Sequence, residues 1–263
     1  MNDLQFGDVS VSLDESVGLV EIHRPPHNYF DRQLVENLAD AFDSLDRDPA
    51  CRALVLASEG KSFCAGANFN RTASDSDAEG PLGTSTSQLY KQAIRLFGYG
   101  KPVVAAIQGA AIGGGFGLAL VADFRVVSPE ARFAANFVKL GIHPGFGLTY
   151  TLPRLIGVQR ASLMFYTGRR IGGEEAVAWG LGDLLAAPDK VREVARELAG
   201  EIAECAPLAV QSTRAAIRRG LADAVKNQTD LELSEQLRLM QTEDHKEGVR
   251  AVAERRPGRF IGR

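Results

Sequence analysis

The fold of this chain is decided by two stretches, Phe63-Cys64-Ala65-Gly66-Ala67-Asn68 and Gly109-Ala110-Ala111-Ile112-Gly113-Gly114-Gly115-Phe116-Gly117, which we call the first and second glycine segments. Each follows an apolar run that predicts a strand, over 53–57 and 102–107, and the second leads into a predicted helix over 116–121. Glycine lets the backbone approach a ligand closely, and a helix N-terminus adds partial positive charge. N–H groups aimed at one point from two such segments stabilise negative charge on a carbonyl oxygen. The pattern therefore predicts an enzyme that polarises a carbonyl.

Composition and charge exclude several classes of protein. The 263 residues are 45% hydrophobic and 24% charged, as in a soluble globular protein with one large domain or one domain with a small appendage. The net charge of −3 gives no case for a nucleic-acid surface, and no apolar run approaches the ~20 residues that span a bilayer. Cys51, Cys64 and Cys205 are unpatterned, and no signal-peptide hydrophobic region opens the chain, so we expect a cytoplasmic protein. Histidine and cysteine spacing predicts no metal site.

Strand and helix patterns alternate over the first part of the chain. Strands are predicted over 9–13 and 19–23, a helix follows the N-cap Asp31, and later strands fall at 124–127 and 131–134. Apolar strands that alternate with helices indicate an α/β core. Beyond Leu148 the pattern is almost wholly helical, with a long helix over 222–241 whose predicted buried face carries Leu221, Val225, Leu233, Leu237 and Met240.

Residues 70–88 are small, polar and poor in core-forming side chains, so we expect a loop there, followed by a helix over 89–97. One interpretation is a plain surface connection. The other is a lid, because the loop leaves directly from the first glycine segment.

The chain resembles the crotonase superfamily, also called the enoyl-CoA hydratase/isomerase family, over nearly its whole length. The matching pieces occur in the family's order and spacing: Arg24-Pro25 with Asn28, then 63–68, 101–106, 109–117, 122–125, 140–145, 152–157, 176–181 and 256–260. The resemblance implies a spiral of β-β-α units carrying an acyl-CoA site over residues 1–200. It also implies a helical C-terminal oligomerisation region over 201–263 and a homotrimer or homohexamer.

The resemblance also implies the chemistry. Family members bind acyl-CoA thioesters, with CoA as part of the substrate and no separate cofactor, and stabilise an enolate-like anion on the thioester oxygen. The two backbone donors map to Ala67 and Gly114 of this sequence. The segment from Asp123 to Arg125 maps to scaffolding of the fold.

This sequence departs from the family at both proton-transfer positions. The two glutamates of the hydratases map to Gly117 and Phe137, and neither side chain transfers a proton. His143 suits acid/base work at neutral pH, or it caps the turn in which it lies. Asn136 orients a substrate carbonyl or a water, or it closes a turn. Gly117 and Phe137 make the acyl end roomier and more apolar, which favours a bulky or ring-containing acyl group.

The resemblance places CoA against the backbone around Asn28, Ala65 and Ala67, with Asn68 holding the loop. Phe260 is a candidate to stack on the adenine. Basic residues meet the 3′-phosphate or lie on a solvated helix face: Lys246, Arg255 and Arg259.

Three functional hypotheses follow. The first is an acyl-CoA thioester enzyme of the hydratase/isomerase type, a lyase or isomerase with non-standard acid/base residues. The second is a protein that binds acyl-CoA without converting it, and the third is a CoA-thioester hydrolase.

Overall fold

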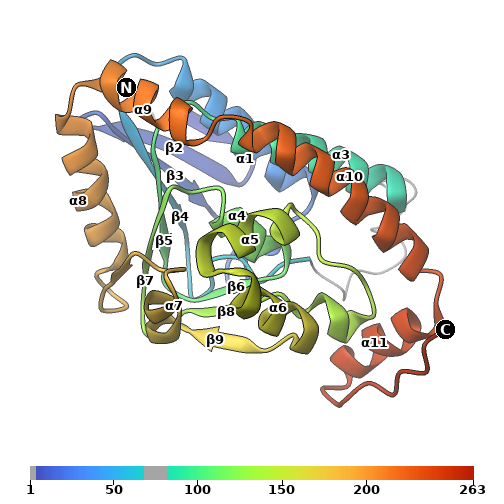
Figure 1. Ribbon diagram of the computed structural model, residues 1–263. Coiled ribbons are helices and arrows are strands. Elements are labelled where there is room, and N and C mark those ends of the chain that lie inside the picture. Colours follow the sequence, from blue (N-terminus) through green and yellow to red (C-terminus); the bar gives the residue numbers. More distant parts are fainter. Residues whose placement is uncertain (1–3, 68–81) are drawn as a thin grey trace.

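A seven-stranded sheet forms the centre of the computed structural model, which describes residues 4–67 and 82–263 (Figure 1). The strand order is β1-β2-β3-β4-β5-β7-β10. The strands are β1 (Leu4–Phe6), β2 (Val9–Asp14), β3 (Val17–Ile22), β4 (Ala53–Ser58), β5 (Val103–Ile107), β7 (Phe124–Val127) and β10 (Leu184–Leu185). β1, β2 and β3 pair antiparallel, which confirms the predicted hairpin, and β3 to β10 pair parallel.

Helices cover both faces of this sheet. Strands β4 and β5 are therefore buried along their whole length. α8 (Val191–Glu204) lies over one face in Figure 1, where its alanines pack on Val55, Val104 and Val126. α1 (Arg32–Asp46) and α3 (Leu82–Phe97) lie over the other face. Asp31 accepts a hydrogen bond from Leu34 N–H, which confirms it as the N-cap of α1.

A smaller sheet lies below the large one in Figure 1 and contains part of the second glycine segment. Its order is β6-β8-β9, with β6 (Ala110–Ile112), β8 (Arg132–Ala134) and β9 (Arg170–Gly172). β6 was not predicted, because three residues between glycines carry no usable periodicity. The short helix α4 (Gly114–Ala119) follows it, and the 3-10 helix η2 (Asn136–Leu140) follows β8.

The rest of the chain is mainly helical, as predicted. Its helices are α5 (Leu148–Ile156), α6 (Val158–Thr167), α7 (Gly173–Trp179), α9 (Pro207–Ile217), α10 (Leu221–Leu239) and α11 (Glu243–Ala253). α10 runs alongside α3 across the molecule, and α11 packs on η2 near the C-terminus (Figure 1). α11 was missed by the sequence analysis.

One predicted boundary and one predicted buried face differ from the structure. α3 begins at Leu82, so residues 82–88 are helical although their Gly, Ser and Thr content predicted a loop. Contacts of α3 with α1 and α10 override that weak local preference. On α10, Leu237 is exposed, whereas Thr229, Glu232 and Gln236 are buried with Val225. The proposed lid falls mostly on residues 68–81, which lie outside the described part of the chain.

Buried charges tie β7 to the C-terminal helices. The carboxylate of Asp123 accepts hydrogen bonds from Arg214 Nε and Arg218 Nη1, both at 2.8 Å. Arg125 is buried and donates to the carbonyl of Leu181 and, at 2.9 Å, to the carboxylate of Asp183. These contacts support the structural role expected for the segment from Asp123 to Arg125.

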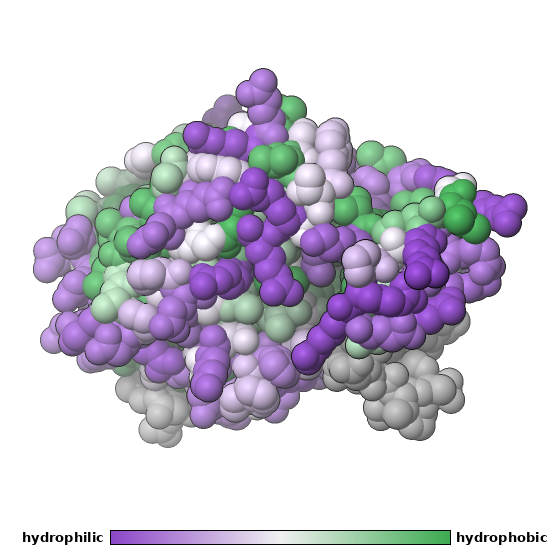
Figure 2. All heavy atoms as spheres, turned by 90° about the horizontal axis from the view of Figure 1, so that it is seen from below, coloured by the Kyte–Doolittle hydropathy of each residue, from purple (hydrophilic) through white to green (hydrophobic). Residues whose placement is uncertain are grey.

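Figure 2 shows the molecule from below the view of Figure 1, and hydrophilic residues cover most of this face. Among the helices of residues 4–67 and 82–263, none combines the length and the apolar character needed to cross a bilayer.

Candidate functional site

The two glycine segments lie side by side. Cys64 pairs with Ala111 in a parallel bridge: Cys64 N–H donates to Ala110 O at 2.9 Å, and Ile112 N–H donates to Cys64 O at 3.0 Å. Gly66 has a φ of +80°, and a Cβ placed on it would lie 2.7 Å from Ile112 O and 4.0 Å from Gly114 N. Only glycine fits this close approach. Gly66 thus brings the start of α4 next to the peptide that joins Gly66 to Ala67.

Backbone hydrogen bonds set the direction of both candidate donors. Gly113 O accepts from Phe116 and Gly117 N–H, so it points into α4, and the N–H of Gly114 on the same trans peptide points out of the helix. As the first residue of α4, Gly114 has no acceptor within the helix. Gly66 O accepts from Phe30 N–H at 3.1 Å, so Ala67 N–H points away from Phe30 N. Ala67 is exposed and Gly114 is buried.

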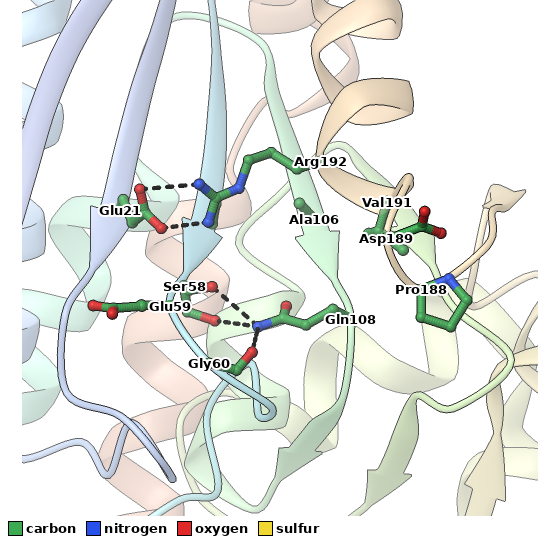
Figure 3. A pocket seen from close by; sticks show the side chains of 11 residues that line it. Glu21, Ser58, Glu59, Gly60, Ala106, Gln108, Pro188, Asp189, Val191 and Arg192 are labelled. Atoms are coloured by element: carbon green, nitrogen blue, oxygen red, sulfur yellow. Dashed lines mark hydrogen bonds and ion pairs between the residues drawn. The ribbon is translucent and has the colours of Figure 1, made fainter.

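Two buried or half-buried amide side chains hold the loop over 58–62, which leads into the first glycine segment. The amide of Asn28 donates to Glu59 O and Ser62 O, both at 2.7 Å, and Asn28 itself is fully buried with a φ of +48°. The Gln108 amide donates to the carbonyls of Ser58 and Gly60 at 3.0 Å, as Figure 3 shows. The side chain of Asn28 therefore fixes the backbone of the loop over 59–62. Ala65 is half-buried, and its N–H donates to His27 O.

The pocket drawn in Figure 3 lies on the α8 face of the large sheet. It measures about 320 Å³ and is lined by Glu21 of β3, residues 57–60, Gln108 and the start of α8. Arg192 of α8 pairs with Glu21 there. The lining contains no residue of either glycine segment, so this pocket is separate from the candidate site.

Aromatic side chains surround the start of α4. A Cβ on Gly114 would lie 2.0 Å from the Phe30 ring, and one on Gly113 would lie 3.7 Å from the tip of Phe137. A Cβ on Gly117 would lie 2.7 Å from Cβ and Cδ1 of Phe146. Phe146 is 1% exposed and packs edge-on against Phe30, with ring centroids 6.0 Å apart. Both positions expected for the hydratase glutamates are thus in apolar surroundings.

His143 lies in the loop between η2 and α5, against α10. One ring nitrogen lies 2.8 Å from Pro144 O, and Gln236 donates to the carbonyl of His143 at 3.0 Å. Arg238 lowers the pKa of the Glu235 carboxyl on α10, and His143 adds a smaller effect in the same direction. Asn136 is the half-buried first residue of η2, and its Cα would lie 3.3 Å from a Cβ on Gly168.

The residues expected to meet the adenine and the 3′-phosphate lie in or after α11. Phe260 is 44% exposed in the C-terminal segment, Lys246 pairs with Glu243, and the backbone N–H of Arg259 donates to Glu247. Arg255 has a φ of +54°. Asn68 lies outside the described residues. Within residues 4–67 and 82–263, no three His, Cys, Asp or Glu side chains gather as metal ligands.

A buried carboxylate that binds the loop after Phe146 was not predicted. Glu232 of α10 is fully buried and accepts hydrogen bonds from Gly147 N–H, Thr149 N–H and the Thr149 hydroxyl. The predicted buried face of α10 carries Leu221, Val225, Leu233, Leu237 and Met240, and a glutamate in a charged helix ordinarily lies on the solvent side. No sequence signal pointed to it.

Stability should fall with rising pH because of Glu232. Burial raises the pKa of Glu232 from its ordinary 4.5 to about 7, against the opposing effect of its three hydrogen bonds. The folded state therefore holds this proton more tightly, and its stabilising effect is lost as pH rises from about 4.5 through about 7. Urea unfolding should show that the wild type loses roughly 3 kcal/mol more than Glu232→Gln between about pH 4 and pH 8. Equal pH dependence of the two proteins would contradict this.

The chain is similar to known enoyl-CoA hydratases and isomerases in sequence and in structure. The sequence model of the family described as Enoyl-CoA hydratase/isomerase matches residues 12–263. The crotonyl-CoA hydratase of Syntrophomonas wolfei subsp. wolfei is 32% identical over 266 residues, 99% of this chain and 100% of the relative. The 1,2-epoxyphenylacetyl-CoA isomerase of Escherichia coli (strain K12) is 30% identical, over 95% of this chain and 97% of the relative. The crystal structure of an enoyl-CoA hydratase/isomerase from Pseudoalteromonas atlantica T6c has a TM-score of 0.85 at 27% identity, covering 97% and 100% of the two chains.

Proposed function

Because the chain belongs to the enoyl-CoA hydratase/isomerase family, we propose that it polarises an acyl-CoA thioester with the backbone N–H groups of Ala67 and Gly114. The observation that supports the proposal is the close approach of Gly66 to the start of α4: a Cβ on Gly66 would lie 4.0 Å from Gly114 N, and the N–H of Gly114 has no acceptor within its helix. The described α/β fold with its C-terminal helices is the crotonase-like fold.

The two N–H groups would act on charge that develops during the reaction. Loss of a proton from the carbon next to a thioester carbonyl places negative charge on the carbonyl oxygen. Donors held by the backbone pay no reorganisation when that charge appears, and one such donor contributes roughly 2.7–4 kcal/mol. The half-buried rings of Phe30 and Phe137 beside them favour an apolar acyl group and lower the local dielectric.

Proton transfer then needs a group other than residues 117 and 137. His143 is the candidate, with a reference pKa of ~6.5. CoA would lie along the backbone around Asn28, Ala65 and Ala67, with Asn136 and Gly117 toward the acyl end and Phe260 toward the adenine. Exposed apolar side chains on α6 and α9 support a homotrimer or homohexamer: Val158, Tyr166, Leu208 and Ile217. The three free cysteines support a cytoplasmic protein.

A second candidate function is binding of acyl-CoA without conversion. It is favoured by Gly117, whose side-chain space is taken by Phe146, and by Phe137, which has no proton to give. In this case the same two N–H groups would bind the thioester carbonyl of the ground state.

The purified protein should consume at least one member of a panel of enoyl-, 3-hydroxyacyl- and aryl-substituted CoA thioesters. His143→Ala should lower kcat by about 10²–10⁴-fold if the imidazole carries the proton. Binding of thioesters without turnover would establish the second function instead. Absence of both binding and turnover would reject the proposal.

A further inference from the structure

One face of α10 holds the loop over 143–149. Gln236 donates to His143 O at 3.0 Å and accepts from the buried Tyr90 hydroxyl of α3 at 2.9 Å. Four residues earlier on the helix, Glu232 binds Gly147 and Thr149. These side chains recur at the spacing of one helix face, so the whole loop is held along a single line of α10.

Glu232 satisfies three donors at once. Gly147 N–H lies 2.8 Å from Oε2, and Thr149 offers its N–H at 3.1 Å and its hydroxyl at 2.5 Å to Oε1. A carboxylate has enough lone pairs on two oxygens for this set, whereas a glutamine has one acceptor oxygen. Since Gly147 and Glu232 are buried, removal of the carboxylate would leave donors without partners.

Within this loop, Phe146 has a backbone conformation that residues with a side chain rarely adopt. Phe146 has a φ of +62° and Gly147 a φ of +71°. Such a backbone persists when neighbouring contacts determine it. The Glu232 bond to Gly147 N–H is made at the peptide that directly follows Phe146, so it fixes the orientation from which the Phe146 side chain leaves the backbone.

Phe146 contacts α4, the helix that begins with Gly114. It packs on Gly117, one turn further along α4, and against Phe30, whose ring lies on Gly114. Movement of Phe146 would therefore reach the start of α4 through two contacts, at the acyl side of the proposed site.

From this geometry we infer that Glu232 is a positioning residue for the thioester site, which it controls by holding Phe146 against Gly117. The inference rests on the proposed function. Glu232 touches no substrate; it keeps the loop over 143–149 in the one arrangement that leaves the start of α4 undisturbed. The affinity for an acyl thioester should depend on Glu232. The affinity for free CoA should not, because free CoA lacks the acyl group that reaches α4.

The test compares Glu232→Ala with Thr229→Ala in calorimetric titrations with butyryl-CoA and with free CoA. Thr229 is a matched control, because it is buried on the same helix but its hydroxyl donates only to Lys226 O. If the loop over 143–149 in Glu232→Ala adopts its wild-type arrangement about a tenth of the time, this variant should bind butyryl-CoA about tenfold more weakly than the wild type. Its affinity for free CoA should change less than about twofold, and Thr229→Ala should change neither affinity.

Glu232→Gln keeps one acceptor and should recover part of the butyryl-CoA affinity, and it decides the question if Glu232→Ala does not fold. Hydrogen exchange supplies a readout that needs no ligand: the Gly147 and Thr149 amides should exchange faster in the Glu232 variants than in Thr229→Ala. Equal selectivity for butyryl-CoA over CoA in the wild type and the Glu232 variants would overturn the inference. Faster amide exchange in a protein whose wild type binds no thioester would instead reject the proposed function alone.

Discussion

Gly114→Ala should lower kcat/KM for the best CoA thioester by about 10²–10³-fold, the effect of losing one oxyanion donor. The added Cβ would lie 2.0 Å from Cζ and 2.2 Å from Cε1 of Phe30, closer than packed carbon atoms approach. Either the ring or the first turn of α4 must shift, and a shift of α4 moves the N–H that the proposal assigns to the thioester oxygen. Steady-state kinetics on the folded variant measure the loss.

Gly200→Ala is the matched control for that substitution. Gly200 lies inside α8, and a Cβ on it would meet nothing within 4 Å. This change should leave kcat/KM unaltered and raise the free energy of unfolding by roughly 0.5–1 kcal/mol through helix propensity. Kinetics of Gly114→Ala within about threefold of the wild type would count against the role of Gly114.

The largest loss of stability is expected from Asp123→Ala. Asp123 accepts hydrogen bonds from Val103 N–H, Arg214 Nε and Arg218 Nη1, and the side chains of the two arginines are only 9% and 13% exposed. Burial lowers the pKa of Arg218, and Asp123 opposes that effect. Without the carboxylate, two buried cations lack their partner, which costs about 3–5 kcal/mol. Urea unfolding of the variant measures this cost.

Asp230→Ala provides the comparison for a charge removed at the surface. Asp230 pairs with Lys226 on α10 at 2.8 Å, and both side chains are more than half exposed. Such a pair contributes at most about 0.5 kcal/mol. If Asp123→Ala costs no more than Asp230→Ala, the buried network does not stabilise the fold as described.

Much of the fold could be predicted because its elements carry local signals. The hairpin of β2 and β3, the Asp31 cap and the all-buried strands β4 and β5 follow from alternation, capping chemistry and apolar runs. The glycine segments were placed correctly next to strands, and their apposition follows from Gly66, since its φ of +80° suits glycine alone.

Contacts between distant segments could not be predicted. Phe146 reads as an ordinary apolar residue, yet it fills the space beside Gly117. Glu232 reads as a solvent-facing helix residue, yet it binds a loop 83 and 85 positions away. Both depend on how α10 crosses the loop over 143–149, and periodicity within one helix does not contain that information. The domain boundary near residue 200 and the roles of His143, Asn136 and Phe260 stay predictions.

A crystal structure of the protein with a slowly reacting acyl-CoA thioester tests the proposed oxyanion hole most directly. We expect the thioester carbonyl oxygen to lie about 2.7–3.1 Å from both Ala67 N and Gly114 N. A carbonyl oxygen bound by other groups, with neither of these N–H groups within hydrogen-bond distance, would contradict it.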